Sequence, residues 1–359
     1  MESEQSFMQI RNIISLADIT MEWWESLYAQ CCEIIEHPAD YTDACKGKVL
    51  ATMFFEPSTR TSFSFQAAVQ RLGGGTIGFS DPLGTSASKG ETLADTTKVI
   101  SQYSDTIVIR SPLEGSATAA AMYSDVPVIN AGDGGHFHPT QTLADLATIA
   151  QKRGKIENLR IGLCGDLKYG RTVHSIVEAM SIFPGISFHL ISPQELRMPD
   201  YILSQMRSRN QDFIESEDFV QTIPELDILY MTRIQRERFH SSAEYRRLRG
   251  IFILTNELLK QAKPDMLIMH PLPRYGEIDP QVDSDPRAAY FDQVRNGMFI
   301  RMALLLNLMH SPRQAPPPLL GNNEIKCENP ACVSQTETYL LQLDSETSTK
   351  FCRYCDREL

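Results

Sequence analysis

Residues 56–62, Glu-Pro-Ser-Thr-Arg-Thr-Ser, place hydroxyl groups and an arginine at the junction of a strand-length apolar run, 49–55, and a helical pattern. Because Glu56 precedes a proline, we expect the helix to start within 58–60. Hydroxyls, backbone N–H groups, the helix dipole and a guanidinium at one point favour an anion, most naturally phosphate. A capped helix with a solvated arginine is the alternative for this turn alone.

Arginines recur in this context, each at or just after the end of a predicted strand. They are Arg60, Arg110, Arg171 and Arg233. Strands that alternate with helices predict parallel sheets, in which ligands lie beyond the carboxyl ends of the strands. Converging guanidiniums are costly unless anions neutralise them, so we expect substrates that carry a phosphate and one or two carboxylates. His138 and Gln141, at a neighbouring strand end, suit a carbonyl or amide group.

Lys89 ends a segment, 73–90, that is rich in glycine, serine and threonine. A polar loop of this length is unusual unless it closes over a site. A solvated lysine is the alternative when Lys89 is considered by itself.

The elements that position these residues fall into two similar halves, because the pattern R-T-x-x-S at 60–64 recurs at 171–175. We therefore predict an α/β protein with two doubly wound parallel-sheet domains and an active-site cleft between them. The boundary is expected inside a helix over 141–151. The predicted domains are 1–145, completed by helix 290–310, and 146–289.

Composition excludes several classes of protein. The 359 residues are 42% hydrophobic and 22% charged, as in ordinary globular proteins. No apolar run reaches the roughly 18 residues of a membrane span, and residues 1–20 lack the blocks of a signal peptide, so we expect a cytoplasmic protein without a membrane partner. The net charge of −11 argues against nucleic acid as a partner.

The residues after the last predicted helix, 311–359, differ in composition from the rest of the chain. A proline-rich stretch, 311–321, is predicted to be a stiff linker. Beyond it, in a predicted domain over 322–359, lie a C-x4-C and a C-x2-C pair. They are Cys327 with Cys332, and Cys352 with Cys355. In a reducing compartment such pairs favour one structural Zn²⁺ per chain on a small β ribbon, rather than two disulfides.

Six strings resemble the catalytic chain of aspartate carbamoyltransferase, in the order expected for that family. They are F-F-E-P-S-T-R-T at 54–61, K-G-E-T-L at 89–93, H-P-T-Q at 138–141, G-D-L-K-Y-G-R-T-V-H at 165–174, M-T-R-I-Q at 231–235 and H-P-L-P-R at 270–274. The resemblance covers roughly residues 8–310. It implies transfer of the carbamoyl group of carbamoyl phosphate to the amino group of L-aspartate in pyrimidine biosynthesis, with no organic cofactor.

The resemblance also implies roles for the matched residues. The carbamoyl phosphate set is Ser58, Thr59, Arg60, Thr61, Arg110, His138 and Gln141, with Lys89. The aspartate set is Arg171, Arg233 and Gln235, with Lys89 and the backbone carbonyls of Leu272 and Pro273. The implied catalytic set is Arg60, Thr61, Arg110, His138 and Lys89.

In this family Lys89 and a hydroxyl four residues earlier reach into the neighbouring subunit's site, so the resemblance implies a homo-oligomer, at least a trimer. The family has serine at that position, whereas this chain has Thr85 followed by Ser86. Either hydroxyl could serve.

The tail resembles the zinc domain of the regulatory chain of aspartate carbamoyltransferase, without the nucleotide-binding domain that precedes it there. We expect it to dock on the catalytic domains and support assembly, without regulation by ATP or CTP through the usual site.

Two alternatives remain at this stage. Ornithine carbamoyltransferase shares S-T-R-T, but it typically has H-C-L-P where this chain has H-P-L-P at 270–273, and Arg233 and Gln235 favour a dicarboxylate. In a different class, the tail would be a nucleic-acid-binding ribbon on an inactive scaffold, which the acidic composition and the arginine set disfavour.

Overall fold

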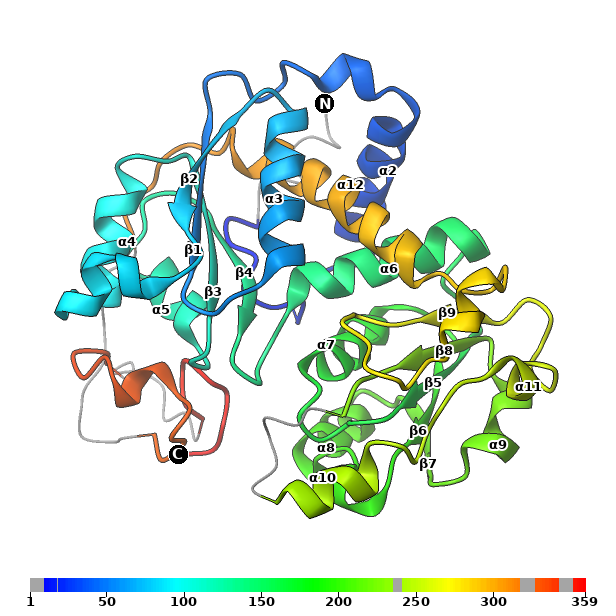
Figure 1. Cartoon of the computed structure of the whole chain (residues 1–359). Coiled ribbons are helices and arrows are strands. Elements are labelled where there is room, and N and C mark those ends of the chain that lie inside the picture. The colour runs from blue at the N-terminus through cyan, green and yellow to red at the C-terminus, as the bar shows by residue number, and fades with distance from the viewer. Residues whose placement is uncertain (1–9, 18, 235–240, 317–326, 342–350) are drawn as a thin grey trace. The chain divides into compact units, whose positions relative to one another are not determined.

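The computed structural model describes residues 10–17, 19–234, 241–316, 327–341 and 351–359 (Figure 1). The chain divides into two compact units. The first is Met1–Thr140 with Met298–Leu359, and the second is Gln141–Gly297.

The first unit is built on a parallel sheet with the strand order β2-β1-β3-β4. The strands are β1 (Val49–Phe54), β2 (Gly75–Phe79), β3 (Thr106–Ser111) and β4 (Val128–Asp133). Its helices are α2 (Met21–Glu36), α3 (Thr59–Arg71), α4 (Leu93–Ser101) and α5 (Ser116–Ala121). Strands β3 and β4 are buried along their whole length, as expected of parallel strands that helices cover on both faces.

The second unit has a parallel sheet with the order β7-β6-β5-β8-β9. The strands are β5 (Arg160–Cys164), β6 (Ser187–Ile191), β7 (Asp212–Ser216), β8 (Ile228–Met231) and β9 (Leu267–Met269). Its helices are α7 (Arg171–Ala179), α8 (Asp200–Ser208), α9 (Phe219–Thr222), α10 (Ser242–Leu248) and α11 (Asn256–Leu259). The prediction of two doubly wound parallel sheets is therefore confirmed.

Two helices contribute to both units. Helix α6 (Pro139–Arg153) begins at the last residues of the first unit, and α12 (Tyr290–Leu308) ends in it. In the second unit, fully buried Asp145 on α6 accepts hydrogen bonds from the Tyr230 hydroxyl and the Gln293 amide, both at 2.8 Å. In the first unit, Arg301 on α12 donates to the Ser64 hydroxyl at 3.0 Å. The units divide between Thr140 and Gln141, at the first turn of α6.

Strand β2 is a correction to the expected loop over 73–90. Residues Gly75–Phe79 pair in parallel with Val49–Met53 of β1. The strand was not predicted from the sequence because it is a partly exposed edge strand in which two of five residues are glycine. Gly78 is needed there, since a Cβ would lie 2.1 Å from the Thr52 carbonyl oxygen. The loop that carries Lys89 is correspondingly shorter and contains two 3-10 turns, Pro82–Gly84 and Ser86–Lys89.

The tail belongs to the first unit. Its described residues contain a 3-10 turn, Val333–Gln335, and an antiparallel bridge between Phe351 and Glu358, which is the part of the expected β ribbon seen within the described residues. Val333, Leu340 and Tyr354 share a buried apolar cluster with residues of β3, α4 and α5. The tail therefore packs on the first sheet's helices through an apolar contact.

Among the described residues, no helix has the length and apolar character needed to cross a bilayer.

Candidate active site and metal centre

The predicted anion-binding turn lies at the carboxyl end of β1. Helix α3 begins at Thr59 with Ser58 as its N-cap, which confirms the expected start within 58–60. The Ser58 side chain makes no capping hydrogen bond, so it does not occupy the N–H groups at the helix start. Thr61 is buried, whereas Arg60 is exposed. This arrangement presents backbone donors and a guanidinium in one turn, as anion binding requires.

Arg110 connects this turn to the end of β4. It lies in β3 opposite Phe54 of β1, and its carbonyl accepts a hydrogen bond from Phe55 at 2.8 Å. Its guanidinium donates to the Ala131 carbonyl at 3.0 Å and pairs with the Glu56 carboxylate at 3.0 Å. Glu56 was not among the predicted site residues, although its position just after a predicted strand, like that of the arginines, could have indicated a site residue. The buried guanidinium is thus oriented by groups from two neighbouring strands.

Strands β1 and β3 also mark the point where the order of the first sheet reverses, because β2 lies on one side of β1 and β3 on the other. Such a switch point is where doubly wound sheets bind ligands. The turn over 58–61 and Arg110 both lie at it.

His138 directly precedes α6, which follows β4, and Gln141 lies in the first turn of that helix. His138 is buried, and the Gln141 amide donates to Asp145 at 2.8 Å. The loop before them is held by Asp133, whose carboxylate accepts hydrogen bonds from the Asn130 side chain at 2.9 Å and the Phe137 N–H at 3.0 Å. Asp133 therefore supports the segment that carries His138.

Lys89 is exposed at the end of its 3-10 turn, followed by Gly90 with φ of 92°. The Thr85 hydroxyl donates to the Pro82 carbonyl at 2.7 Å within the same loop. Ser86 is exposed. Both candidate hydroxyls thus lie in the loop that leads to Lys89.

The second unit repeats the arrangement of arginines at a switch point. Strands β5 and β8 are neighbours at the reversal of strand order, with Cys164 opposite Met231. Arg171 begins α7 after β5, and Arg233 lies two residues beyond β8. Gly165, with φ of +119°, lets the two strand ends approach, since a Cβ there would lie 2.4 Å from the Thr232 carbonyl oxygen. Gln235 lies outside the described residues.

The loop after β9, which is the next strand in this sheet, presents Leu272 and Pro273. Leu272 has φ of +52° and a cis bond to Pro273. Positive φ is unfavourable for leucine, and such residues persist where surrounding contacts hold them, often at functional sites. The Leu272 N–H donates to His270 Nδ1 at 2.8 Å, and His270 Nε2 lies 2.7 Å from the Glu277 carboxylate.

Glu277 and His270 form a buried pair. Burial by itself would raise the pKa of Glu277, but the hydrogen bonds that its carboxylate accepts from His270 and from the Tyr275 N–H outweigh this effect, and the pKa is lowered. Because Nδ1 of His270 accepts from Leu272, Nε2 is the atom that donates to Glu277. Glu277 was not predicted from the sequence, since it lies seven positions after His270 in a loop without periodic pattern.

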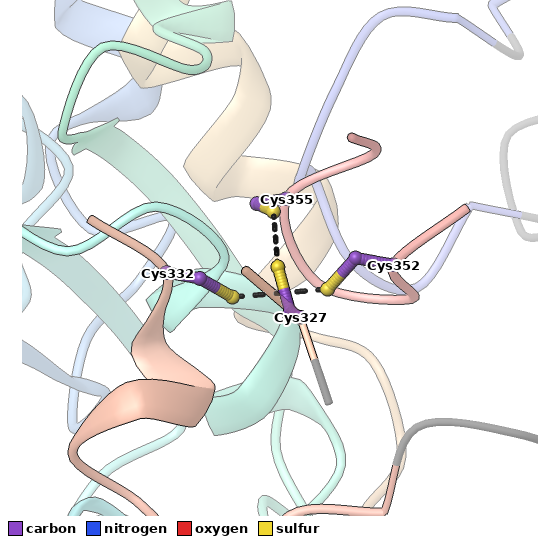
Figure 2. A group of neighbouring side chains, drawn as sticks. All are labelled: Cys327, Cys332, Cys352 and Cys355. Atoms are coloured by element: carbon purple, nitrogen blue, oxygen red, sulfur yellow. Dashed lines mark hydrogen bonds between the residues drawn. The ribbon is translucent and has the colours of Figure 1, made fainter. Parts of the chain in front are cut away.

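The tail cysteines come together as predicted. All four sulfur atoms lie within 4.8 Å of one another and all four residues are buried. Figure 2 shows the sulfur atoms of the four side chains gathered at one point, with Cys327–Cys355 3.6 Å apart and Cys332–Cys352 3.7 Å apart. These separations exceed the ~2.05 Å of a disulfide, and they match the edges of ~3.8 Å expected of a tetrahedron with Zn–S bonds of ~2.3 Å. The donor set therefore fits a tetrahedral metal ion.

The chemistry of the cluster also suits metal binding. Hydrogen bonds from the thiols of Cys332 and Cys355 lower the pKa of the Cys352 thiol, whereas the shared hydrogen bonds raise the pKa of Cys332 and burial raises that of Cys327, so Cys352 is the cysteine that the cluster favours as a thiolate. The thiolate is the form that ligates a metal.

Polar contacts join the tail to the first unit around Glu114. Its buried carboxylate accepts from the Asn329 amide at 2.7 Å and from Arg357 at 3.2 Å. Nearby, His136 bridges Asp133 and Asp356, each at 3.1 Å. Burial would lower the pKa of His136, but the two carboxylates raise it to about 10, so this bridge is charged at neutral pH.

Comparison with known proteins identifies the family. Residues 11–151 match the family model "Aspartate/ornithine carbamoyltransferase, carbamoyl-P binding domain", and residues 157–308 match "Aspartate/ornithine carbamoyltransferase, Asp/Orn binding domain". The chain belongs to the aspartate/ornithine carbamoyltransferase family. The cysteine-rich tail lies beyond both matched regions.

Curated relatives narrow the choice within this family. The chain is 53% identical over 299 residues to a protein of Finegoldia magna named aspartate carbamoyltransferase catalytic subunit, covering 83% of this chain and 98% of the relative. It is 54% identical over 300 residues to the protein of the same name from Clostridium botulinum strain Eklund 17B, with the same coverage. Both names specify aspartate rather than ornithine.

Solved structures give the same result for the fold. The catalytic subunit of M. jannaschii aspartate transcarbamoylase is 44% identical with a TM-score of 0.78, and the match covers 83% of this chain and 98% of that one. Aspartate transcarbamoylase of Trypanosoma cruzi, in a complex with carbamoyl phosphate and aspartate, is 34% identical with a TM-score of 0.79, covering 84% and 97%.

Proposed function

We propose that this chain transfers the carbamoyl group of carbamoyl phosphate to the amino group of L-aspartate, giving N-carbamoyl-L-aspartate and phosphate in pyrimidine biosynthesis. The observation that carries the proposal is the position of the motif residues in a chain of this family. In each unit they lie at or beyond the carboxyl ends of parallel strands, and Arg60, Arg110, Arg171 and Arg233 lie at the switch points of the sheets. One substrate named in the T. cruzi complex carries a phosphate and the other carries two carboxylates.

The phosphate would bind at the start of α3. Ser58, Thr59, Arg60 and Thr61 offer hydroxyls, N–H groups and a guanidinium there. Arg110, His138 and Gln141 would contact the carbamoyl group. Two contacts support this assignment, because the Arg110 guanidinium is oriented by the Glu56 carboxylate, just beyond β1, and by the Ala131 carbonyl in β4.

The reaction would proceed without a covalent enzyme intermediate. The aspartate amine attacks the carbamoyl carbon, and a C–N bond forms while negative charge grows on the carbonyl oxygen. Arg110, His138 and Thr61 stabilise that charge. The C–O bond to phosphate then breaks, and the leaving phosphate accepts the proton of the amine. Catalysis consists of orientation and electrostatic stabilisation, each worth several kcal/mol in favourable sites.

Aspartate would be held by the second unit. Arg171, Arg233 and Gln235 would bind its carboxylates, and the carbonyls of Leu272 and Pro273 would contact the bound substrates. The positive φ of Leu272, fixed by His270, supports a functional role for this loop. In this arrangement a domain over 1–145 with helix 290–310 would bind carbamoyl phosphate, and a domain over 146–289 would bind aspartate.

The active unit would be a homotrimer or a larger homo-oligomer. Lys89 and the hydroxyl of Thr85 or Ser86 would enter the site of a neighbouring subunit, where Lys89 would contact both substrates and assist catalysis. The exposure of Lys89 agrees with this role. Oligomerisation and a cytoplasmic location remain predictions.

The tail would hold one structural Zn²⁺ through Cys327, Cys332, Cys352 and Cys355. Zn²⁺ favours four thiolates at tetrahedral spacing, and the four buried sulfurs provide that set. The ion would fix the fold of a domain over 322–359, beyond the linker 311–321, and it has no place in the transfer reaction. The domain is too small to be stabilised by its own core, so metal binding would supply much of its folding energy.

An assay of carbamoyl transfer tests the proposal directly. The purified full chain, mixed with carbamoyl phosphate and L-aspartate, should form N-carbamoyl-L-aspartate and an equal amount of phosphate. L-ornithine in place of L-aspartate serves as the control. Citrulline formation that exceeds carbamoyl-aspartate formation would contradict the assignment to aspartate, and the absence of either product would contradict the activity.

A further inference from the structure

The first turn of α4 is capped by the tail. The N–H of Leu93, its first residue, lies 3.1 and 3.2 Å from the two carboxylate oxygens of Glu337. The N–H of Ala94 donates to the Tyr339 hydroxyl at 3.0 Å. The third N–H, that of Asp95, donates to the Thr92 hydroxyl of the helix's own N-cap at 3.1 Å.

These bonds satisfy the N–H groups that a helix start leaves without intrahelical partners. Capping side chains normally come from the residue just before the helix. Here the acceptors are distant in sequence: Glu337 lies 244 residues after Leu93, and Tyr339 lies 245 residues after Ala94. Leu93 and Ala94 are buried, so without these acceptors their N–H groups would be shielded from water as well.

The capped turn is continuous with the loop that carries Lys89. Only Gly90, Glu91 and Thr92 separate Lys89 from the start of α4. Glu91 is tied at both ends, since its N–H donates to the Ser86 carbonyl at 3.3 Å and its carboxylate accepts from the Thr96 hydroxyl at 2.8 Å. The position of the first turn of α4 therefore sets where the Lys89 loop ends.

Glu337 and Tyr339 are held in turn by the tail fold. They lie between the two cysteine pairs in the sequence, and the N–H of Glu337 donates to the Val333 carbonyl at 2.9 Å. The Tyr339 ring packs edge-on against Tyr123, with 5.8 Å between centroids. Val333 belongs to the apolar cluster that includes the four cysteines. The acceptors are thus placed by the same short domain that forms the metal centre.

We propose that Glu337 and Tyr339 are positioning residues for the transfer reaction: by capping α4 they fix the loop that presents Lys89. The inference rests on the proposed function, in which Lys89 contacts the substrates. It gives the tail a role in each catalytic cycle in addition to its expected role in assembly. A tail that lost its fold would release the first turn of α4, and the loop would spend less time in the competent position.

Substitutions at the cap test this role in the intact chain. Glu337→Ala with Tyr339→Phe removes both acceptor groups, and Glu337→Gln retains an oxygen acceptor. Arg357→Ala is the matched control, because it removes a tail contact to Glu114 that does not involve α4. Zinc content and oligomer mass, measured for every variant, establish that the tail and the assembly are retained.

Two readouts decide the outcome. Hydrogen exchange of the 86–95 segment should become at least about tenfold faster in the double variant and should stay unchanged in Arg357→Ala. The kcat/KM for carbamoyl phosphate should fall about tenfold in the double variant, with Glu337→Gln recovering much of the loss.

The proposal is overturned if exchange in the 86–95 segment does not change, or if it rises while kcat/KM stays at the wild-type value. An equal loss in Arg357→Ala would also overturn it, because the effect would then belong to tail docking in general. Failure of the proposed function is distinguishable, since it would appear as an inactive wild-type chain whose exchange data still report on the cap.

Discussion

At Gly115 the backbone of the first sheet's loop meets the backbone of the tail. Gly115 has φ of +83°, and a Cβ built on it would lie 2.5 Å from Tyr354 Cβ and 2.6 Å from the Tyr354 carbonyl carbon and oxygen. Gly115→Ala should therefore loosen the tail. Gly47→Ala is a matched control in the same unit, because Gly47 has φ of +79° and nothing within 4 Å of its Cβ position.

Both substitutions place alanine in a left-handed backbone conformation, but only Gly115→Ala also creates a steric overlap. The left-handed backbone disfavours alanine by roughly 1–2 kcal/mol at both positions. At Gly115 alone, a carbon at 2.5 Å is about 1 Å closer than an ordinary contact of ~3.5 Å or more, and the opposing atoms are the Cβ and the backbone carbonyl of Tyr354, which side-chain rotation cannot move away. Overpacking of this kind costs typically about 1–3 kcal/mol. The difference between the variants should therefore be about 1–3 kcal/mol, or about 5- to 150-fold in the opening equilibrium of the tail.

Amide hydrogen exchange measures that opening directly. Two backbone hydrogen bonds cross the contact, from Glu114 N–H to the Ala331 carbonyl at 2.8 Å and from Val333 N–H to the Glu114 carbonyl at 2.9 Å. In Gly115→Ala the exchange of both amides should be about 5- to 150-fold faster than in Gly47→Ala. A local measurement is preferable to a melting curve, because a chain with two units need not unfold in one step. Equal exchange in the two variants would refute the steric argument.

Three further predictions concern catalysis, metal and pH. Arg60→Ala should reduce kcat by about 100-fold or more, whereas Arg233→Ala should mainly raise KM for aspartate; near-normal steady-state kinetics in either would contradict the assigned roles. Chelation of the metal, or Cys352→Ser, should increase exchange in the tail and lower the solution mass, and an apo protein with unchanged mass and thermal stability would count against a structural metal. The lowered pKa of Glu277 means that its pair with His270 contributes stability above the unfolded pKa of about 4.3, and that this contribution is lost as pH falls through the lower folded value. A Glu277→Gln variant should show a weaker loss of stability over that acid range. If the pH dependence of its unfolding free energy were unchanged, the pair would not contribute to acid sensitivity.

Much of the site followed from the sequence because its signals are local. A strand, a polar turn and a helix start occupy consecutive residues, so the start of α3 could be predicted to within two residues. The cysteine pairs were equally informative, since thiols at those spacings suit one tetrahedral ion, and the four sulfurs do come together. Parallel sheets then placed the arginines at strand ends.

Features that depend on distant contacts were not predictable in this way. Strand β2 is exposed and glycine-rich, and it is stabilised by pairing with β1 rather than by its own apolar pattern. Glu56 could be seen in its motif, but its pairing with Arg110 depends on the parallel register of β1 and β3.

The sequence by itself determined the kind of chemistry, because residue types and short spacings decide which anions and metals a chain can bind. Only the tertiary structure decided what holds that chemistry in place. The clearest case is the first turn of α4, whose N–H groups are satisfied by Glu337 and Tyr339. A hydrogen bond across more than 240 residues leaves no periodic or spacing signal, since it depends on the folded positions of both partners rather than on their distance in sequence.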